Sequence, residues 1–467
     1  MRFRLLLTAG VLALVWPAAA SASDWTGYLG GTRHRSASPE TAITPTNAAS
    51  LHVVWQWSPP ASAGSRPQAQ LFASPTIANG RVYVGSNSGV FYARDEASGA
   101  GVWSRNLGFV PALTCSARGI NATASVARDP ARGGAATVYV TGADAKLWAL
   151  DAATGAVVWE RQLAPLSSTE NGYYGWSSPT VVAGHVYVGL ASQCDDPLVR
   201  GGVVEVDQSS GQVLHRYWSV PPGSVGASVW TSVAASRDGA SVYATTGNGD
   251  EIPGDDQGDS YAIVRLDGTT MKRLSLWSVP VSARPTDADF GASPALFTAS
   301  LAGTPTGMVA ACNKNGILYA WRAAKPSAGP VWKTRIDTGS DAANCLASAI
   351  VDAKHLYQAG GATTVAGSTV AGTVSQLDPA TGAVLWRTVL PGAVLGTGSI
   401  DASGVLAVPL DTSGTSTGGG VELLAAATGA ILARIGTANA FSQPVFANGR
   451  LLVATIGGGL TMYAPAP

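Results

Sequence analysis

The segment VYATTGNGDEIPGDD, Val242 to Asp256, gathers oxygen-bearing side chains in a short stretch of the chain. They are Asn248, Asp250, Glu251, Asp255 and Asp256. Carboxylate and amide oxygens are the ligands that Ca²⁺ prefers in proteins. Asparagine and aspartate are also ordinary turn residues. The segment therefore has two interpretations: an acidic rim around a metal-dependent cofactor, or a solvated loop without chemistry.

The elements that must position this segment belong to a repeated unit. Residues 80–103, GRVYVGSNSGVFYARDEASGAGVW, are echoed by residues 136–159 and 372–386, and weaker copies fill the rest of the chain. Each copy consists of short β-branched or aromatic runs between Gly, Asn, Asp and Ser, which predicts four antiparallel strands with tight turns. A tryptophan recurs once per unit, at Trp103, Trp159, Trp218, Trp277, Trp332 and Trp386. This period is typical of a β-propeller.

The repeats predict an all-β fold, an eight-bladed β-propeller of four-stranded antiparallel blades. Seven copies are full, and the last, Phe441 to Tyr463, ends before its fourth strand. We expect residues 51–57, LHVVWQW, to supply that strand from the N-terminus, because closure of the ring removes an exposed sheet edge. The predicted organisation is a secretory signal peptide at 1–22, an irregular clasp at 23–50 and one propeller at 51–467.

The N-terminal residues and the charge balance limit the compartment and the classes of partner expected for this protein. Residues 1–22 have two arginines, an apolar run and small residues before the expected cleavage site, which predicts a secreted or periplasmic protein. No later stretch is apolar enough to span a membrane. The 29 basic residues balance the 29 acidic ones, so no global field attracts nucleic acid or an anionic membrane.

The motif Asp-x-x-Thr-Gly-x-x-x-Trp, as in DAATGAVVW and DPATGAVLW, resembles the repeat of the pyrroloquinoline-quinone (PQQ) β-propeller family. That family includes quinoprotein alcohol dehydrogenases and non-catalytic outer-membrane assembly propellers. The repeat is found in both groups, so it specifies the fold better than the activity. Four further segments resemble the dehydrogenase branch, and TDADFGASP is most similar to the polyvinyl-alcohol-dehydrogenase-like type.

The resemblance implies a role for individual residues. TTGNGD places the metal-ligating amide on Asn248, and GASVWTS places the aromatic floor of the cofactor on Trp230. TDADFGASP places the catalytic base, which also ligates the metal, on Asp289, and NKNGILYAW places the cation that contacts the quinone oxygens on Lys314. Arg118, in TCSARG, resembles an arginine that holds a cofactor carboxylate.

Taken singly, each residue has a plain alternative. Trp230 could be core packing, Asn248 a turn residue, and Lys314 a hairpin tip, while Asp287 and Asp289 could cap a loop. Their occurrence together, in family order, on consecutive predicted blades favours the functional interpretation.

The chain departs from the dehydrogenase pattern at two places. Where the family supplies a metal-binding glutamate, Gln193 aligns best, and Asp195 or Asp196 could replace it only if the loop shifts. Lanthanide-using relatives have a second aspartate two residues after the catalytic one, where this chain has Gly291, so the resemblance implies calcium.

The four cysteines predict two disulfides in an exported protein. The adjacent-cysteine disulfide of many dehydrogenases is absent, because TCSARG contains one cysteine. Cys115 and Cys194 fall in predicted loops on one face of the ring, as do Cys312 and Cys345, so we expect those two pairings.

The leading functional hypothesis is an exported, PQQ- and calcium-dependent dehydrogenase that oxidises a small-molecule or polymeric alcohol. No Cys-x-x-Cys-His haem motif occurs, so electrons are expected to pass to a separate acceptor. The alternative is a non-catalytic propeller of the same fold that acts as a protein- or glycan-binding scaffold, which Gln193 favours.

Overall fold

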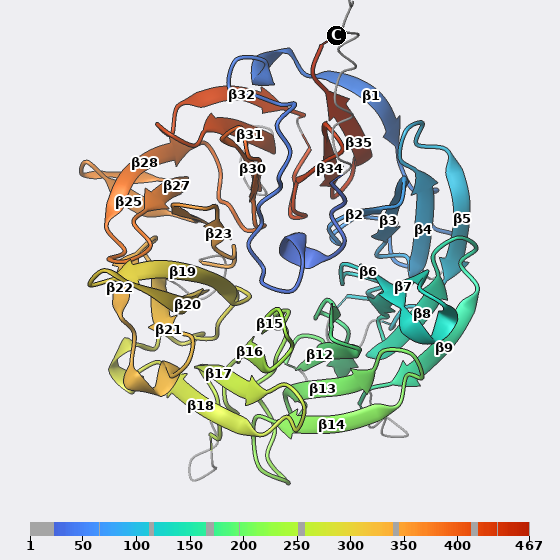
Figure 1. The fold of residues 1–467 in the computed structure, drawn as a ribbon, viewed down its shortest axis with the longest axis horizontal. Coiled ribbons are helices and arrows are strands. Elements are labelled where there is room, and N and C mark those ends of the chain that lie inside the picture. The colour runs from blue at the N-terminus through green and yellow to red at the C-terminus, as the bar shows by residue number, and fades with distance from the viewer. Residues whose placement is uncertain are drawn as a thin grey trace, which may run out of the picture.

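The computed structural model describes residues 23–64, 66–111, 116–164, 172–195, 197–250, 257–339, 345–411, 419–436 and 438–466. These residues form a ring of eight four-stranded antiparallel blades around a central axis (Figure 1). The predicted eight-bladed β-propeller is therefore confirmed. In each blade the first strand lies nearest the axis and the fourth lies on the rim.

The strands of the first four blades follow the order of the chain. Blade one has β2 (Thr76–Ala78), β3 (Arg81–Gly85), β4 (Val90–Asp95) and β5 (Gly101–Asn106). Blade two has β6 (Ser125–Asp129), β7 (Ala135–Thr141), β8 (Lys146–Asp151) and β9 (Val157–Gln162). Blade three has β11 (Thr180–Val182), β12 (His185–Ser192), β13 (Gly202–Asp207) and β14 (Val213–Trp218), with β10 (Tyr173–Tyr174) paired to the end of β12. Blade four has β15 (Ala234–Ala235), β16 (Ser241–Thr245), β17 (Ala262–Asp267) and β18 (Arg273–Ser278).

The remaining blades repeat the pattern with two additions. Blade five has β19 (Ala295–Leu301), β20 (Thr304–Asn313), β21 (Ile317–Arg322) and β22 (Trp332–Arg335). Blade six has β23 (Ile350–Val351), β24 (Leu356–Gly360), β27 (Gly372–Leu377) and β28 (Val384–Leu390), and a hairpin of β25 (Thr363–Val365) and β26 (Ser368–Val370). Blade seven has β29 (Ser399–Ile400), β30 (Val405–Leu410), β31 (Gly420–Ala425) and β32 (Ile431–Ile435). Short 3₁₀ turns are η1 (Tyr28–Gly30), η2 (Ala48–Ser50), η3 (Pro130–Arg132), η4 (Val281–Ala283) and η5 (Pro326–Ala328).

Blade eight is closed by both ends of the chain. It contains β33 (Val445–Ala447), β34 (Arg450–Thr455), β35 (Gly459–Ala464) and, as its outer strand, β1 (His52–Trp57). β1 pairs antiparallel with β35, with Trp57 opposite Leu460. The expected N-terminal fourth strand is therefore present, and the two ends of the chain are joined in one sheet.

The recurring tryptophans lie on outer strands and seal the junctions between blades. Trp103 in β5 donates an indole hydrogen bond of 3.1 Å to the carbonyl of Ala152 in the next blade. Its ring packs on Gly155, which has φ +71° and whose added Cβ would lie 2.6 Å from the indole. The Asp151 carboxylate accepts from the amide of Thr154 at 2.9 Å and fixes the turn. The Asp-x-x-Thr-Gly repeat thus encodes a turn shaped for the preceding blade's tryptophan.

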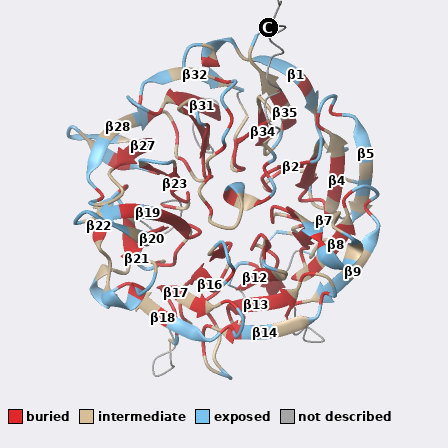
Figure 2. Ribbon diagram, viewed as in Figure 1, coloured by how far each residue is buried: buried red, intermediate tan, exposed pale blue. Residues whose placement is uncertain are grey.

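The hydrophobic core is divided into clusters, one at each junction between neighbouring blades. Inner and middle strands are buried while outer strands alternate between intermediate and exposed, as Figure 2 shows. Each blade therefore depends on its two neighbours for burial, and the ring holds the inner strand ends in fixed positions.

Residues 24–40, within the predicted clasp of residues 23–50, run around the inner edge of the ring and contact several blades in turn. Trp25 exchanges backbone hydrogen bonds with Ile77 of blade one. The carbonyls of Thr26, Thr32, Arg33 and Arg35 accept from amides of blades two, four, five and six, and Ser36 and Ser38 bond to Ile400 of blade seven. This segment crosses the central opening in Figure 1. The clasp thus links blades that are far apart along the chain.

Candidate functional site

A belt of hydroxyl groups surrounds the axis just ahead of the first strands of blades one to seven. The backbone amide of Ser74 donates to Thr123 Oγ1 at 3.0 Å, and the backbone amide of Thr123 donates to Ser178 Oγ at 3.0 Å. The same bond recurs from Ser178 to Ser232, Ser293, Ser348 and Thr397, each at 2.8–2.9 Å. The backbone amide of Gln443 donates to Ser74 Oγ at 2.9 Å. Its side chain has no hydroxyl, so the series does not continue toward blade seven. The belt thus links the starts of the first strands in neighbouring blades.

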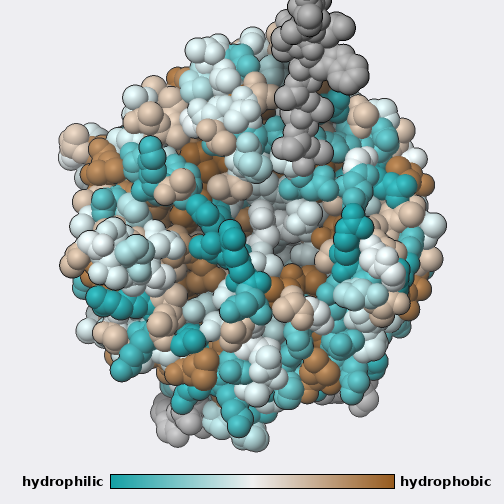
Figure 3. All heavy atoms as spheres, in the orientation of Figure 1, coloured by the Kyte–Doolittle hydropathy of each residue, from teal (hydrophilic) through white to brown (hydrophobic). Residues whose placement is uncertain are grey.

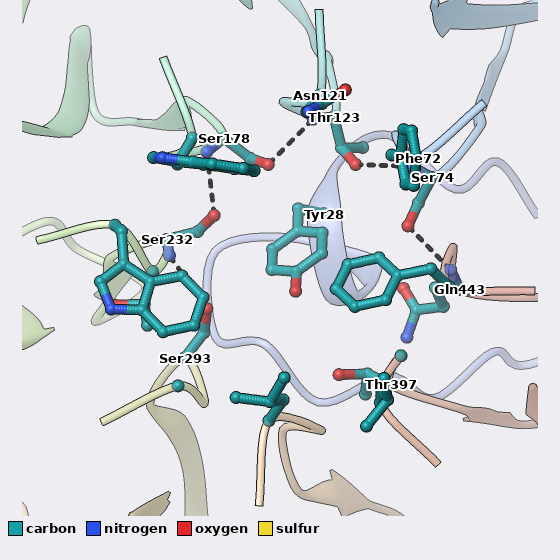
Figure 4. Close-up of a pocket in the computed structure, with 18 of the residues that line it drawn as sticks. Tyr28, Phe72, Ser74, Asn121, Thr123, Ser178, Ser232, Ser293, Thr397 and Gln443 are labelled. Atoms are coloured by element: carbon teal, nitrogen blue, oxygen red, sulfur yellow. Dashed lines mark hydrogen bonds between the residues drawn. The ribbon is translucent and has the colours of Figure 1, made fainter. Parts of the chain in front are cut away.

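A cavity of about 270 Å³ lies within this belt. Figure 4 shows Tyr28, from η1 of the clasp, at its centre, facing the belt side chains. Its wall also includes two indoles, a guanidinium, an amide and several apolar side chains: Trp176, Trp230, Arg118, Asn121, Phe72, Leu346, Leu395 and Phe441. The cavity therefore combines aromatic surface with a few polar groups, as small-molecule sites do.

Trp230 and Asp289 meet at the edge of this cavity. Trp230 lies four residues before β15, and Asp289 lies six residues before β19, so the two come from neighbouring blades. The indole Nε1 of Trp230 donates to Asp289 Oδ2 at 2.8 Å. Lys314, in the turn after β20, places its Nζ 2.6 Å from Asp289 Oδ1 and 5.5 Å from the centroid of the Trp230 ring. The structure thus brings together the residues assigned as floor, base and cation.

Asn248 and Asp287 make further hydrogen bonds to Lys314 and to the loop that carries Asp289. Lys314 Nζ donates to Asp287 Oδ2 at 2.7 Å, and Asn248 Nδ2 donates to Asp287 Oδ1 at 2.9 Å. The Asn248 Oδ1 atom accepts from the backbone amide of Ala288 at 3.1 Å. Asn313 anchors the same loop by donating to the Ala288 carbonyl at 2.6 Å. Because Asn248 and Asn313 hold the backbone of this loop, the carboxylates of Asp287 and Asp289 are presented to one ammonium group.

The two carboxyl groups of this cluster titrate differently. Asp289 is 6% exposed, and burial, with the nearby charge of Asp287, raises its pKa to about 7 although Lys314 opposes the shift. Burial also acts to raise the pKa of Asp287, but hydrogen bonds from Asp289, Lys314 and Asn248 outweigh it and lower that pKa. Burial acts to lower the pKa of Lys314, and the two carboxylates reverse this and raise it. Asp289 is thus the group that can exchange a proton near neutral pH.

Arg118 and Asn121 carry polar atoms that have no partner within the described part of the chain. The buried Nε of Arg118 and both amide atoms of Asn121 lack hydrogen bonds there. The Arg118 guanidinium lies 5.1 Å from the Trp176 ring centroid. Buried polar groups are normally satisfied, so these three atoms on the cavity wall suit a ligand with hydrogen-bonding oxygens.

Gln193, which aligns with the metal-binding glutamate of the family, makes a hydrogen bond through its side-chain amide. It is buried, and its Nε2 donates to the carbonyl of Ser116 at 3.2 Å. Partial desolvation raises the pKa of Asp195 and the ammonium of Lys314 opposes this, so Asp195 is within electrostatic range of Lys314. In the acidic loop of residues 242–256, Asp250 accepts a hydrogen bond from Gln257 at 3.4 Å. Glu251, Asp255 and Asp256 of this loop lie outside the described residues, as does Asp196.

Cys312 and Cys345 form a disulfide with a Cα–Cα distance of 5.3 Å. Cys194 is also disulfide-bonded, and its expected partner, Cys115, lies outside the described residues. Cys312 is the penultimate residue of β20 and is followed by Asn313 and Lys314. The Cys312–Cys345 bond therefore fixes the start of the turn that carries Lys314.

The sequence interpretation missed Tyr28, Asn121 and Trp176, and it missed the belt hydroxyls as a group. The sequence does carry a pattern that indicates the belt. Ser74, Ser178 and Ser293 each lie two residues before a first strand and directly before a proline. Tyr28 has none, since its approach to the axis depends on the path of the clasp.

The chain is similar to several known proteins. The family described as "Glucose/ethanol/alcohol dehydrogenase, beta-propeller domain" matches residues 25–334, and "Outer membrane protein assembly factor BamB" matches residues 370–466. The chain is 32% identical over 189 residues to 1-butanol dehydrogenase (cytochrome c) of Thauera butanivorans, covering 40% of this chain and 25% of that protein. It is 22% identical over 249 residues to polyvinylalcohol dehydrogenase of a Pseudomonas species, covering 48% and 36%.

Among solved structures, the quinohemoprotein alcohol dehydrogenase of Comamonas testosteroni superposes with a TM-score of 0.72 at 19% identity, covering 96% of this chain and 82% of that one. At this identity the likeness concerns the fold. The matches span well under half the length of the two curated relatives, so their activities, substrates and partners do not transfer directly.

Proposed function

The chain belongs to the family of glucose, ethanol and alcohol dehydrogenase β-propeller domains, and on this premise we propose that it is a PQQ- and calcium-dependent alcohol dehydrogenase. The observation that carries the proposal is the convergence of Trp230, Asp289 and Lys314 at the edge of the axial cavity. This convergence pairs a group that titrates near neutrality with a buried cation and a flat aromatic surface.

The residues of the cavity suit PQQ, a flat aromatic quinone with three carboxylates. The unsatisfied Nε of Arg118 and the amide of Asn121 would pair with carboxylate oxygens, and the indole of Trp230 would lie against the ring system. When bound, PQQ supplies an electrophilic carbonyl that accepts a hydride from the alcohol carbon.

The chain's own residues would handle the proton and the charge. The Asp289 carboxylate is the candidate acceptor for the hydroxyl proton of the alcohol, with Trp230 orienting its Oδ2 and Lys314 its Oδ1. Lys314 would hold that carboxylate in place and stabilise negative charge that develops on an adjacent oxygen. Asn248 and Asn313 would keep Asp289 fixed during the transfer by holding the backbone of its loop.

The fit to calcium is partial. Asn248, Asp287 and Asp289 offer hard oxygens, but Lys314, Trp230 and the amide of Ala288 already donate to them. No group of three or more His, Cys, Asp or Glu side chains that could hold a metal occurs among the described residues. We propose Asn248 and Asp289, with Gln193, as the side chains that would bind the ion, and we assign no step to it.

The extra carboxylate that accompanies a lanthanide in relatives is less compatible with this site. An added Cβ at Gly291 would lie 2.3 Å from Leu346 and 3.3 Å from the Trp230 ring. An aspartate at this position would therefore displace the indole or Leu346. This crowding supports calcium over a lanthanide.

The proposal extends to export and electron transfer. Residues 1–22, the expected signal peptide, lie outside the described residues, and no helix in the described part of the chain has the length and apolar character of a membrane span. The name of the Thauera relative includes cytochrome c, which supports a separate acceptor here. The substrate class proposed is a primary or secondary alcohol, small or polymeric.

The test is to titrate the purified protein with PQQ and Ca²⁺, follow tryptophan quenching, and then measure alcohol-dependent dye reduction. Saturable binding with turnover is expected. Arg118→Gln should weaken PQQ binding while Arg128→Gln, an exposed position, should not. Binding without turnover would indicate a degenerate enzyme. Absence of binding would favour the scaffold alternative, which the similarity of residues 370–466 to an assembly-factor propeller supports.

A further inference from the structure

A second cavity lies on the opposite face of the ring. In an antiparallel blade, the turn between strands one and two is at the end opposite to the turn between strands two and three. Asn248 and Lys314 follow second strands, whereas this cavity is lined by the turns β15–β16, β23–β24 and β29–β30, which follow first strands. Its volume is about 720 Å³. Figure 3 shows the molecule hollowed near the axis, with hydrophilic residues beside the hollow.

Four cations line this cavity, here called the basic pocket. Arg33 and Arg35 come from the clasp, Arg237 from the β15–β16 turn and Lys354 from the β23–β24 turn. They are brought together from three separate regions of the chain. Among the ion pairs within 4 Å in the described residues, none involves any of the four.

The guanidinium groups repel one another. Burial lowers the pKa of Arg33, and the charges of Arg35 and Arg237 lower it further. Burial also lowers the pKa of Arg35; Arg237 adds to this effect and Asp352 opposes it. The buried Nε of Arg35 has no hydrogen-bond partner among the described residues. The pocket thus holds positive charge that Asp352 compensates only in part, and an unsatisfied donor.

The two carboxyl groups of the basic pocket are engaged elsewhere. Asp352 accepts from the amides of Lys354 and His355 at 2.6 Å and from the Tyr357 hydroxyl at 2.8 Å. Asp401 accepts from the amide of Val405 at 2.8 Å, and burial raises its pKa to about 7, which reduces its charge at neutral pH. The excess of positive charge therefore remains available to a ligand.

The clasp holds its arginines in a fixed frame. The carbonyl of Arg33 accepts from Leu296 at 2.9 Å and that of Arg35 from Val351 at 2.8 Å. Between them, His34 is 1% exposed and its Nδ1 lies 3.1 Å from the carbonyl of Pro294. Because the backbone on both sides of His34 is anchored, the two guanidiniums are preorganised on the pocket wall.

We propose that the basic pocket binds a phosphate-type oxyanion through Arg33, Arg35, Arg237 and Lys354. The planar donor fork of arginine matches phosphate oxygens, and several cations in one concavity suit a ligand with more than one negative charge. The same chemistry is presented by free phosphate compounds and by the headgroup of an anionic lipid. This site is separate from the axial cavity and does not depend on the proposed dehydrogenase reaction.

The test uses calorimetric titration of the purified full chain with inorganic phosphate and with pyrophosphate, at constant ionic strength set with chloride. Saturable binding is expected, tighter for pyrophosphate. The double variant Arg33→Gln/Arg237→Gln should bind at least about tenfold more weakly, since two charge-assisted contacts are lost. Arg237 is exposed and the Arg33 side chain makes one 3.4 Å contact with the Leu296 carbonyl, so the fold should persist.

Arg322→Gln, an exposed arginine of blade five outside the pocket, is the matched control and should bind like the parent. Sedimentation with phosphatidylglycerol and phosphatidylcholine vesicles distinguishes the sources: arginine-dependent binding to the anionic vesicles assigns a lipid headgroup, and phosphate binding without vesicle binding assigns a free compound. Loss of saturable binding in constant salt, or equal binding by the double variant and the parent, overturns the proposal.

Discussion

The indole Nε1 of Trp230 donates a 2.8 Å hydrogen bond to Oδ2 of Asp289, across the junction between blades four and five. An indole at the floor of the cavity is thereby tied to the carboxyl group proposed as the base. The ring has one donor and no acceptor, so it can only stabilise the carboxylate form. Orientation of the base and the shape of the cavity are therefore set by one side chain.

Replacement of Trp230 by phenylalanine separates these two contributions. Trp230→Phe keeps an aromatic surface but removes the donor to the carboxylate, so the pKa of Asp289 should rise above about 7 and the rate profile should shift to higher pH. We expect kcat to fall by about tenfold at neutral pH with PQQ affinity changed less. The pH profile of dye reduction measures this, and an unchanged profile would contradict the assignment of Trp230.

Replacement of Asp289 should abolish turnover and preserve the fold. Asp289→Asn keeps the size and one acceptor oxygen for Trp230 but cannot take a proton, and loss of a general base costs about 10²–10⁴ in rate. Asp289→Ala should have the same outcome. Asp238→Asn, an exposed turn residue, serves as control. Circular dichroism checks the fold, and unchanged rates in the Asp289 variants would remove it from the mechanism.

Replacement of Lys314 should lower the free energy of unfolding and raise the pKa of Asp289. Lys314→Met leaves Asp287 and Asp289 close together without their shared cation, and breaking a buried pair costs about 3–5 kcal/mol. The ammonium holds the pKa of Asp289 down, so its removal should raise that pKa further. Urea unfolding measures the first effect. Lys314→Arg should retain most of the stability, and equal destabilisation by both variants would argue against a charge effect.

His34 should make the protein sensitive to acid. Burial lowers its pKa from 6.5 to about 4, so the folded state binds this proton less tightly than the unfolded state. The lowered pKa of His34 therefore adds about 3 kcal/mol to the free energy of unfolding. This amount is fully present above pH 6.5 and is lost as the pH falls from about 6.5 to about 4. The free energy of unfolding, measured in urea across this range, tests the prediction.

The matched variants for His34 are His34→Asn and His52→Asn. Asparagine at position 34 can still donate to the Pro294 carbonyl but does not titrate, so the acid-linked loss should become smaller by about that amount. His52 is exposed at the start of β1, and its replacement should leave the pH dependence as it is. The same pH dependence in the parent and His34→Asn would show that other groups cause it.

The Cys312–Cys345 disulfide should stabilise the ring near Lys314. It closes a span of 33 residues, for which restriction of the unfolded chain gives about 3–4 kcal/mol. The Cys312→Ala/Cys345→Ala variant should lose about this much in urea unfolding. Thiol reagent should destabilise the parent more than the variant, because the bond of Cys194 is reduced in both. Equal responses would show that the Cys312–Cys345 bond adds little.

The sequence predicted the ring because its signals are local and repeated. The Asp-x-x-Thr-Gly turn, the outer-strand tryptophans and the missing last strand together specify eight blades and their closure by β1. The belt of hydroxyls was missed, although the residue before a proline carried a signal for it. The belt serines bond to the backbone amide of a neighbouring blade, and no periodicity in the sequence distinguishes them from ordinary turn serines.

By itself, the sequence determined the repeat, its strand order and the residue types that reach the inner ends of blades three to five. Only the tertiary structure decided that Trp230, Asp289 and Lys314 touch, that Gln193 turns to the carbonyl of Ser116, and that Arg33, Arg35 and Arg237 share one pocket. The physical reason is closure of the ring. Turn and strand preferences act over a few residues, whereas these contacts join segments tens to hundreds of residues apart, whose separation is fixed when the eight blades pack together.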